Sequence, residues 1–341
     1  MYNSIMNKSK YLLTLTIPLS VFFSFQGGLF SYLGLFYAFG VIPFLELFLS
    51  SSKKNLDDEN EKKALDDLFF DVLAWLMVPI QYGLMGYYCY VISLGVHNPY
   101  EIVGMTLSMG TACGVLGINV GHELGHRTTW IEQKMALALL LTSQYMHFFI
   151  EHNRIHHKYV STPDDPASAM KGQTLYNYFP QTIFGSWFSC FKLDRSTTLL
   201  YLGIQISFLV AIGLVFGVSS MVGALVSGIF GFLLLETVNY IEHYGLRRKK
   251  NESTGRYEKV QPKHSWNSNH PIGRLVLFEL SRHSDHHANA RRKYQTLRHF
   301  DEAPEMPTGY PGMMILSLFP PLWFKVMDPL VEKTYQNSET I

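Results

Sequence analysis

The stretch IVGMTLSMGTACGVLGINVGHELGH, residues 102–126, decides the fold class. Its first part, Ile102 to Gly121, contains no charged side chain, and as a helix it would be about 30 Å long, the thickness of a bilayer core. The run then passes directly into two histidines, His122 and His126. We therefore expect an all-α integral membrane protein with a polar site at the end of a membrane span.

The rest of the chain has the same character. Only 16% of the 341 residues are charged, against about a quarter in soluble proteins. Lys and Arg are absent from 11–52, 64–126 and 196–246, and the formal net charge of +1 gives no electrostatic reason to expect nucleic-acid binding. We expect one membrane domain, residues 1–341, with six transmembrane helices at about 11–25, 29–49, 68–94, 102–121, 197–216 and 221–240.

The distribution of basic residues predicts the orientation. The links after the first, third and fifth spans contain no Lys or Arg, whereas the other loops and both ends hold all 28 of them. By the positive-inside rule, both termini and the segments 122–196 and 241–341, which would carry the site, are cytoplasmic. The N-terminal run lacks a small-residue cleavage site, so we interpret it as a retained helix. We expect residues 51–67 to be a solvated charged loop, and residues 313–324 to be a packing or interfacial segment broken by two prolines.

The cysteines exclude several kinds of site. Cys89, Cys113 and Cys190 are scattered and form no Cys-x-x-Cys pair. A disulfide framework, a zinc ribbon and a built-in rubredoxin or ferredoxin module are therefore not expected.

Histidines carry the strongest chemical signal. Nine of the 14 fall into four clusters on the expected cytoplasmic side. Spacings of three and four residues put side chains on one helical face, and imidazole suits zinc, iron, copper or nickel. Nine ligands exceed the needs of one ion, so two metal ions with four or five histidines each is the simplest count. The candidate ligands are His122, His126, His152, His156, His157, His243, His283, His286 and His287.

Carboxylates are expected to support these neutral ligands. They would balance the charge of two cations and orient the imidazole rings from behind. The candidates adjoin a cluster or lie within an apolar span, where a lone acid would be costly. They are Glu123, Glu151, Glu236, Glu242 and Asp285.

Two other functions would also use clustered histidines, a zinc protease and a metal carrier. His122-Glu-Leu-Gly-His126 matches the H-E-x-x-H pattern of zinc proteases, with Glu123 as the general base. One zinc site would leave about six clustered histidines unexplained. A metal carrier is the other alternative, but a carrier needs ionisable residues across the bilayer midplane, and these histidines lie at one face.

The histidine clusters resemble those of the membrane alkane 1-monooxygenase family, within the wider histidine-box group of membrane desaturases and hydroxylases. The resemblance covers nearly the whole chain. One departure is Ile155, where the family usually has glycine. The motifs that carry the resemblance are His122-Glu-Leu-Gly-His126, Glu151-His-x3-His-His157, Asn239-Tyr-x-Glu-His-Tyr-Gly245, His264-Ser-Trp-Asn-Ser-Asn-His270, Arg282-His-Ser-Asp-His-His287, Thr162-Pro-x-Asp-Pro-Ala167 and Pro307-Thr-Gly-Tyr-Pro311.

The resemblance implies an activity and its components. It implies two iron ions held by the nine histidines, and O2-dependent terminal hydroxylation of n-alkanes taken from the bilayer. Electrons would come from a separate rubredoxin or ferredoxin with its NAD(P)H reductase, and the protein would lie in a bacterial inner membrane. A hydroxylase of methyl groups on alkyl-aromatics and a fatty acid desaturase or decarboxylase remain as rivals.

Two further expectations concern substrate and partner. We expect the second and third spans to line much of the channel, and the small Ala38 to leave room for long chains. The basic runs Arg247–Lys250 and Arg291–Lys293 could dock an acidic electron carrier. The aromatic residues expected along the channel are Phe30, Tyr32, Phe36, Tyr37, Phe39, Trp75 and Tyr82.

Overall fold

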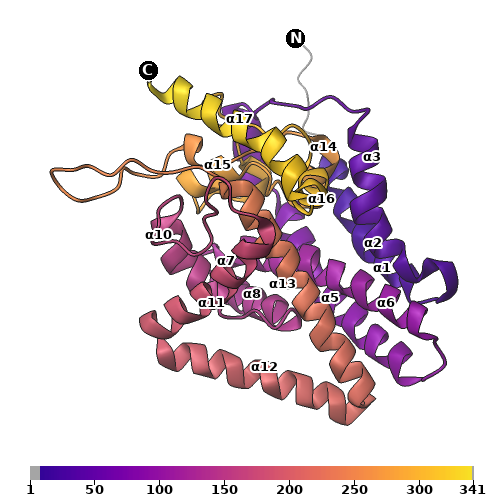
Figure 1. Ribbon diagram of the computed structural model, residues 1–341. Helices are drawn as coiled ribbons and strands as arrows, with labels where there is room; N and C mark the ends of the chain where they lie inside the picture. The colour runs from indigo at the N-terminus through magenta and orange to yellow at the C-terminus, as the bar shows by residue number, and fades with distance from the viewer. Residues whose placement is uncertain (1–7, 340–341) are drawn as a thin grey trace.

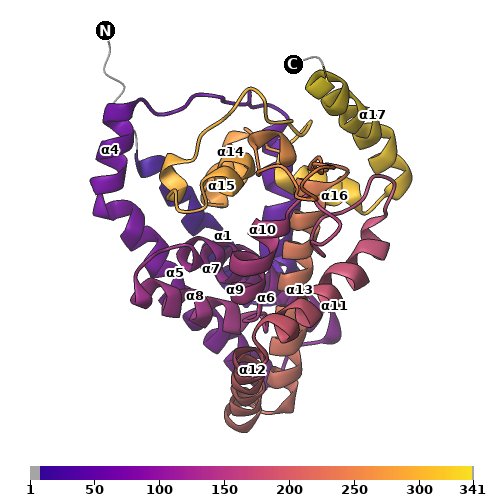
Figure 2. The same cartoon turned by 90° about the vertical axis from the view of Figure 1, so that its left-hand side faces the viewer.

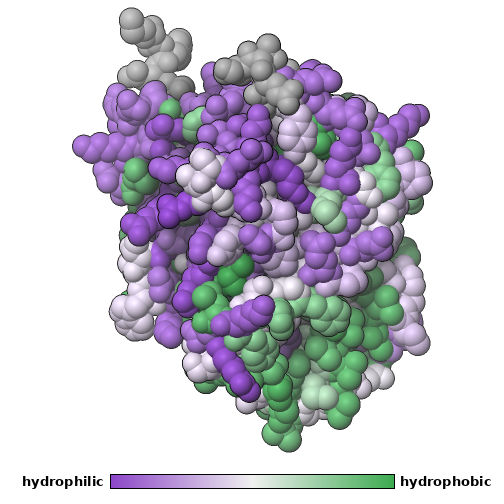
Figure 3. Space-filling model, turned by 60° about the vertical axis from the view of Figure 1, so that its left-hand side comes forward, coloured by the Kyte–Doolittle hydropathy of each residue, from purple (hydrophilic) through white to green (hydrophobic). Residues whose placement is uncertain are grey.

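The computed structural model describes residues 8–339, and it is helical in all its regular elements over that range. The apolar surface is concentrated at one end of the molecule and the polar surface at the other (Figure 3). Helices α14, α15 and α17 lie at the polar end (Figures 1 and 2). Within the described residues, five helical segments are long and apolar enough to cross a membrane, namely Gly28–Glu46, Leu68–Ser93, Pro99–Gly125, Arg195–Phe216 and Val218–His243. The chain is an all-α integral membrane protein.

The α-helices fall into two sets, those of the expected membrane spans with α8 beside them, and the remaining ones. The first set is α1 (Thr16–Ser24), α2 (Leu33–Phe36), α3 (Ile42–Glu46), α5 (Leu68–Ser93), α6 (Pro99–Ala112), α8 (Trp130–Thr142), α12 (Arg195–Phe216) and α13 (Val218–His243). The other α-helices are α4 (Asp58–Asp66), α7 (Val120–Gly125), α9 (Phe148–Glu151), α10 (His157–Tyr159), α11 (Leu175–Leu193), α14 (Pro271–Val276), α15 (His283–Ala288), α16 (Tyr310–Ser317) and α17 (Pro320–Glu339). The π-helices are η3 (Tyr37–Val41), η4 (Cys113–Asn119) and η5 (His152–His156), and the 3-10 helices are η1 (Lys8–Leu15), η2 (Gly28–Tyr32), η6 (Pro262–His264) and η7 (Tyr294–Thr296).

Two spans extend further than the sequence indicated. The fourth was expected to end at Gly121, but its helix continues to Gly125 and carries His122 within it. The sixth was expected to end at Tyr240, and its helix ends on His243. The histidines thus belong to the spanning helices themselves, because burial against other helices keeps these polar turns helical.

The expected first span, 11–25, is not among the five long helices. Residues 8–24 form the 3-10 helix η1 followed by α1, so this region is not one continuous α-helix. A turn follows, in which Gly27 and Gly28 have φ of 81° and 59°, values that favour glycine. The Gly28 amide donates to Glu101 at 2.6 Å, so this turn lies beside the start of α6.

Close approach of α13 to α6 and η4 fixes the frame around the site. A β-carbon at Gly231 would stand 2.6 Å from Cβ of Cys113, and one at Gly110 would stand 2.9 Å from the Ser227 carbonyl. Glycine at both positions lets the backbones meet directly, as small residues do between membrane helices. The helices that carry His122 and His243 are therefore held in fixed relation.

The 51–67 segment is partly helical, contrary to the expected solvated loop. Its residues 58–66 form α4, which begins at the N-cap Asp57. Glu61 on this helix accepts hydrogen bonds from Arg292 and Arg298, so α4 is fastened to the polar end of the molecule. The expected break in 313–324 is confirmed, because α16 ends at Ser317 and α17 begins at Pro320.

Candidate metal centre

The nine clustered histidines come together at the polar end, in two adjoining groups. Within each group the candidate ligand atoms all lie within 4.8 Å of one another. The groups are neighbours, with the ring centroids of His157 and His287 4.6 Å apart. The five-histidine group consists of His122, His126, His152, His157 and His286, and the four-histidine group of His156, His243, His283 and His287.

Each group draws on separate parts of the chain. The helix of α6, η4 and α7 supplies His122, with His126 as its C-cap. Helix α13 ends in His243, and η5 with the start of α10 supplies the second cluster. Helix α15 supplies His286 to one group and its neighbour His287 to the other. The adjacent pair on α15 therefore joins the two groups.

The π-helix η5 explains how the second cluster is divided. In a π-helix the hydrogen bonds join residues five apart, so such residues come round to the same side. His152 and His157 are five apart and lie in the five-histidine group, with their Nε2 atoms 3.0 Å apart. His156 lies in the other group. A regular α-helix would have paired His152 with His156, which is four residues away.

The donor atoms fit a pair of metal ions. Neighbouring Nε2 atoms are 2.9–3.1 Å apart in the five-histidine group and 2.8–3.2 Å apart in the four-histidine group. Nitrogen ligands about 2.1 Å from one ion stand about 3 Å apart when they meet at right angles. The Nε2 atoms of His126 and His156 are buried and have no hydrogen-bond partner among residues 8–339, and a metal ion would supply one.

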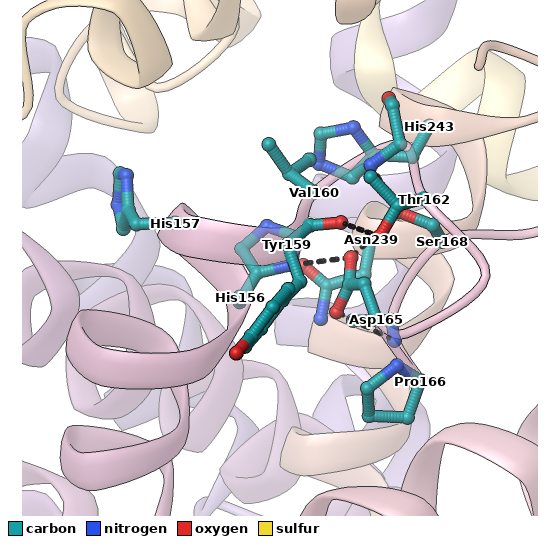
Figure 4. Close-up of polar contacts among 12 residues, drawn as sticks. His156, His157, Tyr159, Val160, Thr162, Asp165, Pro166, Ser168, Asn239 and His243 are labelled. Carbon is teal, nitrogen blue, oxygen red and sulfur yellow. Dashed lines mark hydrogen bonds and ion pairs between the residues drawn. The ribbon is translucent and has the colours of Figure 1, made fainter. Parts of the chain in front are cut away.

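Asp165 is a supporting residue to which the sequence alone gave no role. Its Oδ2 lies 3.0 Å from Nδ1 of His156 and accepts a hydrogen bond from Ser168 at 2.6 Å (Figure 4). The Asp165 side chain is fully buried. A carboxylate on Nδ1 fixes the ring with Nε2 free for a metal. The available signal was the Thr162-Pro-x-Asp-Pro-Ala167 motif, which places an acid shortly after the second histidine cluster.

Of the five carboxylates expected to support the histidines, Glu242 makes a direct contact with one. Its Oε2 lies 3.1 Å from Nε2 of His283. Glu236 instead accepts hydrogen bonds from Tyr145 and Thr182, 2.7 and 2.6 Å away, which account for its burial inside α13. Asp285 accepts from the backbone amide of Arg298 and so orders the segment behind α15.

The other two carboxylates are buried beside the first and second clusters. Glu151 has one oxygen without a partner, and burial raises its pKa to about 8. Glu123 accepts two hydrogen bonds from Arg127, at 3.0 and 2.7 Å, and one from the Tyr294 amide. These bonds tie the Oε1 atom of Glu123 to Arg127 and to the segment at Tyr294.

An apolar cavity reaches both histidine groups. His122 and His152 of one group and His283 of the other form part of its wall, together with Glu242. Aliphatic and aromatic side chains make up most of the rest. These apolar residues include Ile17, Ala38, Phe39, Ile42, Leu234, Leu235, Val238, Val276, Leu277 and Met314.

The cavity wall differs from the one expected. The second span contributes Ala38, Phe39 and Ile42, but the third span contributes no residue to the wall. Phe30 and Phe36 are instead 60% and 62% exposed on the outer surface. The other expected aromatic residues contact protein groups outside the cavity. Trp75 donates to Glu132, and Tyr82 donates to the Ala138 carbonyl. Tyr37 donates to Thr16, and Tyr32 packs on Tyr100. Helices α13, α14 and α16 contribute to the wall in place of the third span, through residues such as Leu234, Val276 and Met314.

The remaining histidines lie outside both groups. His147 is buried with its ring stacked on Trp187 at 3.9 Å, and burial lowers its pKa to about 3. His264 pairs with Glu258 at 3.1 Å, and Nε2 of His299 donates to Asp301 at 3.2 Å. These contacts indicate structural histidines.

Comparison with known proteins agrees with the geometry. The fatty acid desaturase family matches residues 98–317, a range that contains all nine clustered histidines. Alkane 1-monooxygenases of Pseudomonas aeruginosa are 39% and 38% identical to the chain, in each case over 88% of it and over 83% and 84% of their own length. An alkane 1-monooxygenase of Alcanivorax borkumensis is 36% identical over 94% of the chain and 89% of its own length.

A further relative is less similar to the chain. The xylene/toluene monooxygenase hydroxylase component XylM of Pseudomonas putida is 27% identical over 78% of the chain and 74% of its own length. Identity is thus higher, and coverage wider, with the alkane enzymes. The chain belongs to the fatty acid desaturase family and, within it, to the membrane alkane 1-monooxygenases.

Proposed function

We propose that this protein is an O2-dependent monooxygenase that converts n-alkanes to primary alcohols at a di-iron centre. The observation that carries the proposal is the apolar cavity whose wall includes histidines of both groups. A substrate with no polar atom can be held there with one end beside the candidate metal sites. The iron pair, when bound, would supply the reductive activation of O2.

Binding in such a cavity depends on apolar burial and shape. Each methylene group buried there stabilises the complex by about 0.8 kcal/mol. The two histidine groups meet the wall at His122, His152 and His283, which mark its histidine end, and Glu242 on the wall lies 3.1 Å from His283. The chain's contribution to the reaction is to place a terminal methyl group at that end and to keep bulk water from it.

The histidines divide the task of holding the metal ions. We assign one ion to the five-histidine group and the other to the four-histidine group. Asp165 would hold the His156 ring so that Nε2 faces the ion, and the Glu242 carboxylate would place a negative charge beside the four-histidine group.

We further propose six membrane crossings with the site on the cytoplasmic side of a bacterial inner membrane. Residues 8–24 would supply the crossing that precedes the five long helices. In support, Lys8 pairs with Asp67 before α5, whereas the turn at Gly28 contacts Glu101 near the α5–α6 connector at the other end of α5. The basic residues of the loops follow the positive-inside rule for this orientation.

Electrons must come from a separate protein, for which a rubredoxin or ferredoxin with an NAD(P)H reductase is the candidate. The three cysteines of the chain are all buried, and they occupy separate places. They offer no site for an iron–sulfur centre.

The test is product analysis with purified protein, a rubredoxin, its reductase and O2. Octane and hexadecane should give 1-alkanols, with product formation dependent on iron. Exclusive turnover of xylene would instead favour the hydroxylation of methyl groups on aromatics, the activity that the name of XylM suggests. An unsaturated or shortened fatty acid product would favour a desaturase or decarboxylase.

A further inference from the structure

The segment 247–261 forms a basic hairpin that projects from the body of the protein (Figure 1). It contains six Lys or Arg residues and two glutamates. Its own hydrogen bonds order it: the Asn251 amide donates to the Arg256 carbonyl, and the Glu258 amide donates to the Lys249 carbonyl. Lys250 and Tyr257 form a β-bridge across it. The hairpin therefore presents its charges on an ordered, exposed arm.

The base of the hairpin is fastened beside the five-histidine group. The Arg248 guanidinium donates to the Lys158 carbonyl at 2.9 Å, and the Arg248 amide donates to the Ser161 carbonyl at 2.8 Å. Lys158 follows His157 directly and its side chain is exposed, as is that of Arg154, which pairs with Asp194 at 3.6 Å. Basic residues of the hairpin and of the η5–α10 segment therefore meet next to a candidate metal ligand.

The five-histidine group is also the one that approaches the surface. Seven of the nine histidines are buried, whereas His126 and His157 are only partly buried. An electron arriving from outside the protein would have the shortest path through this group. The surface around His157 is therefore where a reduced partner would have to sit.

The other basic run offers much less free charge. Arg292 pairs with Glu61 at 2.6 Å, and Lys293 pairs with Asp71 at 2.7 Å. These two charges are paired within the molecule, which leaves Arg291 as the exposed charge of this run. In the hairpin, by contrast, Lys249, Lys250 and Lys259 are exposed, and the acids nearby are fewer.

We propose that the basic hairpin 247–261, with Lys158 and Arg154, is the docking surface for a small acidic electron-transfer protein that delivers electrons through the five-histidine group. This inference rests on the proposed monooxygenase function. Opposite charges on the two partners would speed their encounter and orient the carrier over His157.

The test reverses charges on the hairpin only. We expect the triple variant Lys249→Glu, Lys250→Glu, Lys259→Glu to raise the KM for rubredoxin about tenfold at low salt, with a smaller effect at high salt. The kcat at saturating rubredoxin, the iron content and the product of a single turnover after anaerobic chemical reduction should stay at wild-type values. The matched control Lys54→Glu, Lys62→Glu, Lys333→Glu changes exposed lysines elsewhere and should leave the KM unchanged.

Three outcomes would overturn the docking surface. One is an unchanged KM in the hairpin variant, and another is an equal rise in the control. The third is a KM effect that appears in bilayers of anionic lipid but not in neutral phosphatidylcholine, which would assign the hairpin to lipid headgroups. Failure of the wild-type protein to make alcohol in the single turnover would instead contradict the proposed function itself.

Discussion

The two histidine groups share one cavity but differ in their surroundings. The five-histidine group reaches the surface at His126 and His157. The four-histidine group is fully buried, and it has two carboxylates in direct contact, Asp165 on His156 and Glu242 on His283. A buried ion with neutral ligands needs nearby negative charge, whereas an ion close to the surface is partly stabilised by water. The difference suggests that one group receives electrons and the other depends on its supporting acids.

Loss of a ligand from the buried group should have the largest effect. We expect His243→Ala to abolish alkane hydroxylation and to lower the iron content from about two ions to about one per chain. Metal analysis and octanol formation on the same purified sample check this. His147→Gln is a matched control at a buried histidine outside both groups, and it should retain both ions. Full activity of His243→Ala would remove the four-histidine group from the reaction.

Removal of a supporting acid should have a smaller effect, confined to the same group. Asp165→Asn leaves the size of the side chain unchanged but removes the charge behind His156, and we expect metal affinity to fall about 10–100-fold. Titration of the apoprotein with Fe²⁺, with each ion followed spectroscopically, would locate the loss. An equal loss at both ions would show that Asp165 supports the fold as a whole rather than one group.

A change in the shared cavity should alter selectivity rather than metal content. Ala38 is 5% exposed and forms part of the cavity wall. Ala38→Trp should fill part of the cavity and shift the preferred substrate towards shorter alkanes, with both ions retained. Relative rates over an alkane series measure this, and Phe36→Trp on the exposed face is the control. An unchanged chain-length profile would mean that substrate lies elsewhere.

Much of this architecture was predictable from local sequence. Charge-free runs such as 102–121 indicated the spans, and histidines four apart, such as His122 and His126, indicated ligands on one helical face. The division of the ligands was not predictable, because the spacing of His152, His156 and His157 implies a different pairing on an α-helix from the one that the π-helix η5 produces.

The other features that the sequence did not predict depend on contacts made only in the folded chain. The acid Asp165 lies nine residues from His156, and only the folded loop brings them together. The expected role of the third span in the channel was wrong, because aromatic content does not reveal which face of a helix is buried. Trp75 and Tyr82 donate hydrogen bonds to residues of α8. The helix α4 was missed because its fastening residues, Arg292 and Arg298, lie far away in the sequence.

We propose that nine imidazoles hold two iron ions at the end of an apolar cavity. The most direct test measures bound metal and O2-dependent octanol formation on one preparation of the purified protein. We expect about two iron ions per chain, and an activity that increases and decreases with the content of both ions. Full activity with a single zinc ion per chain would contradict it.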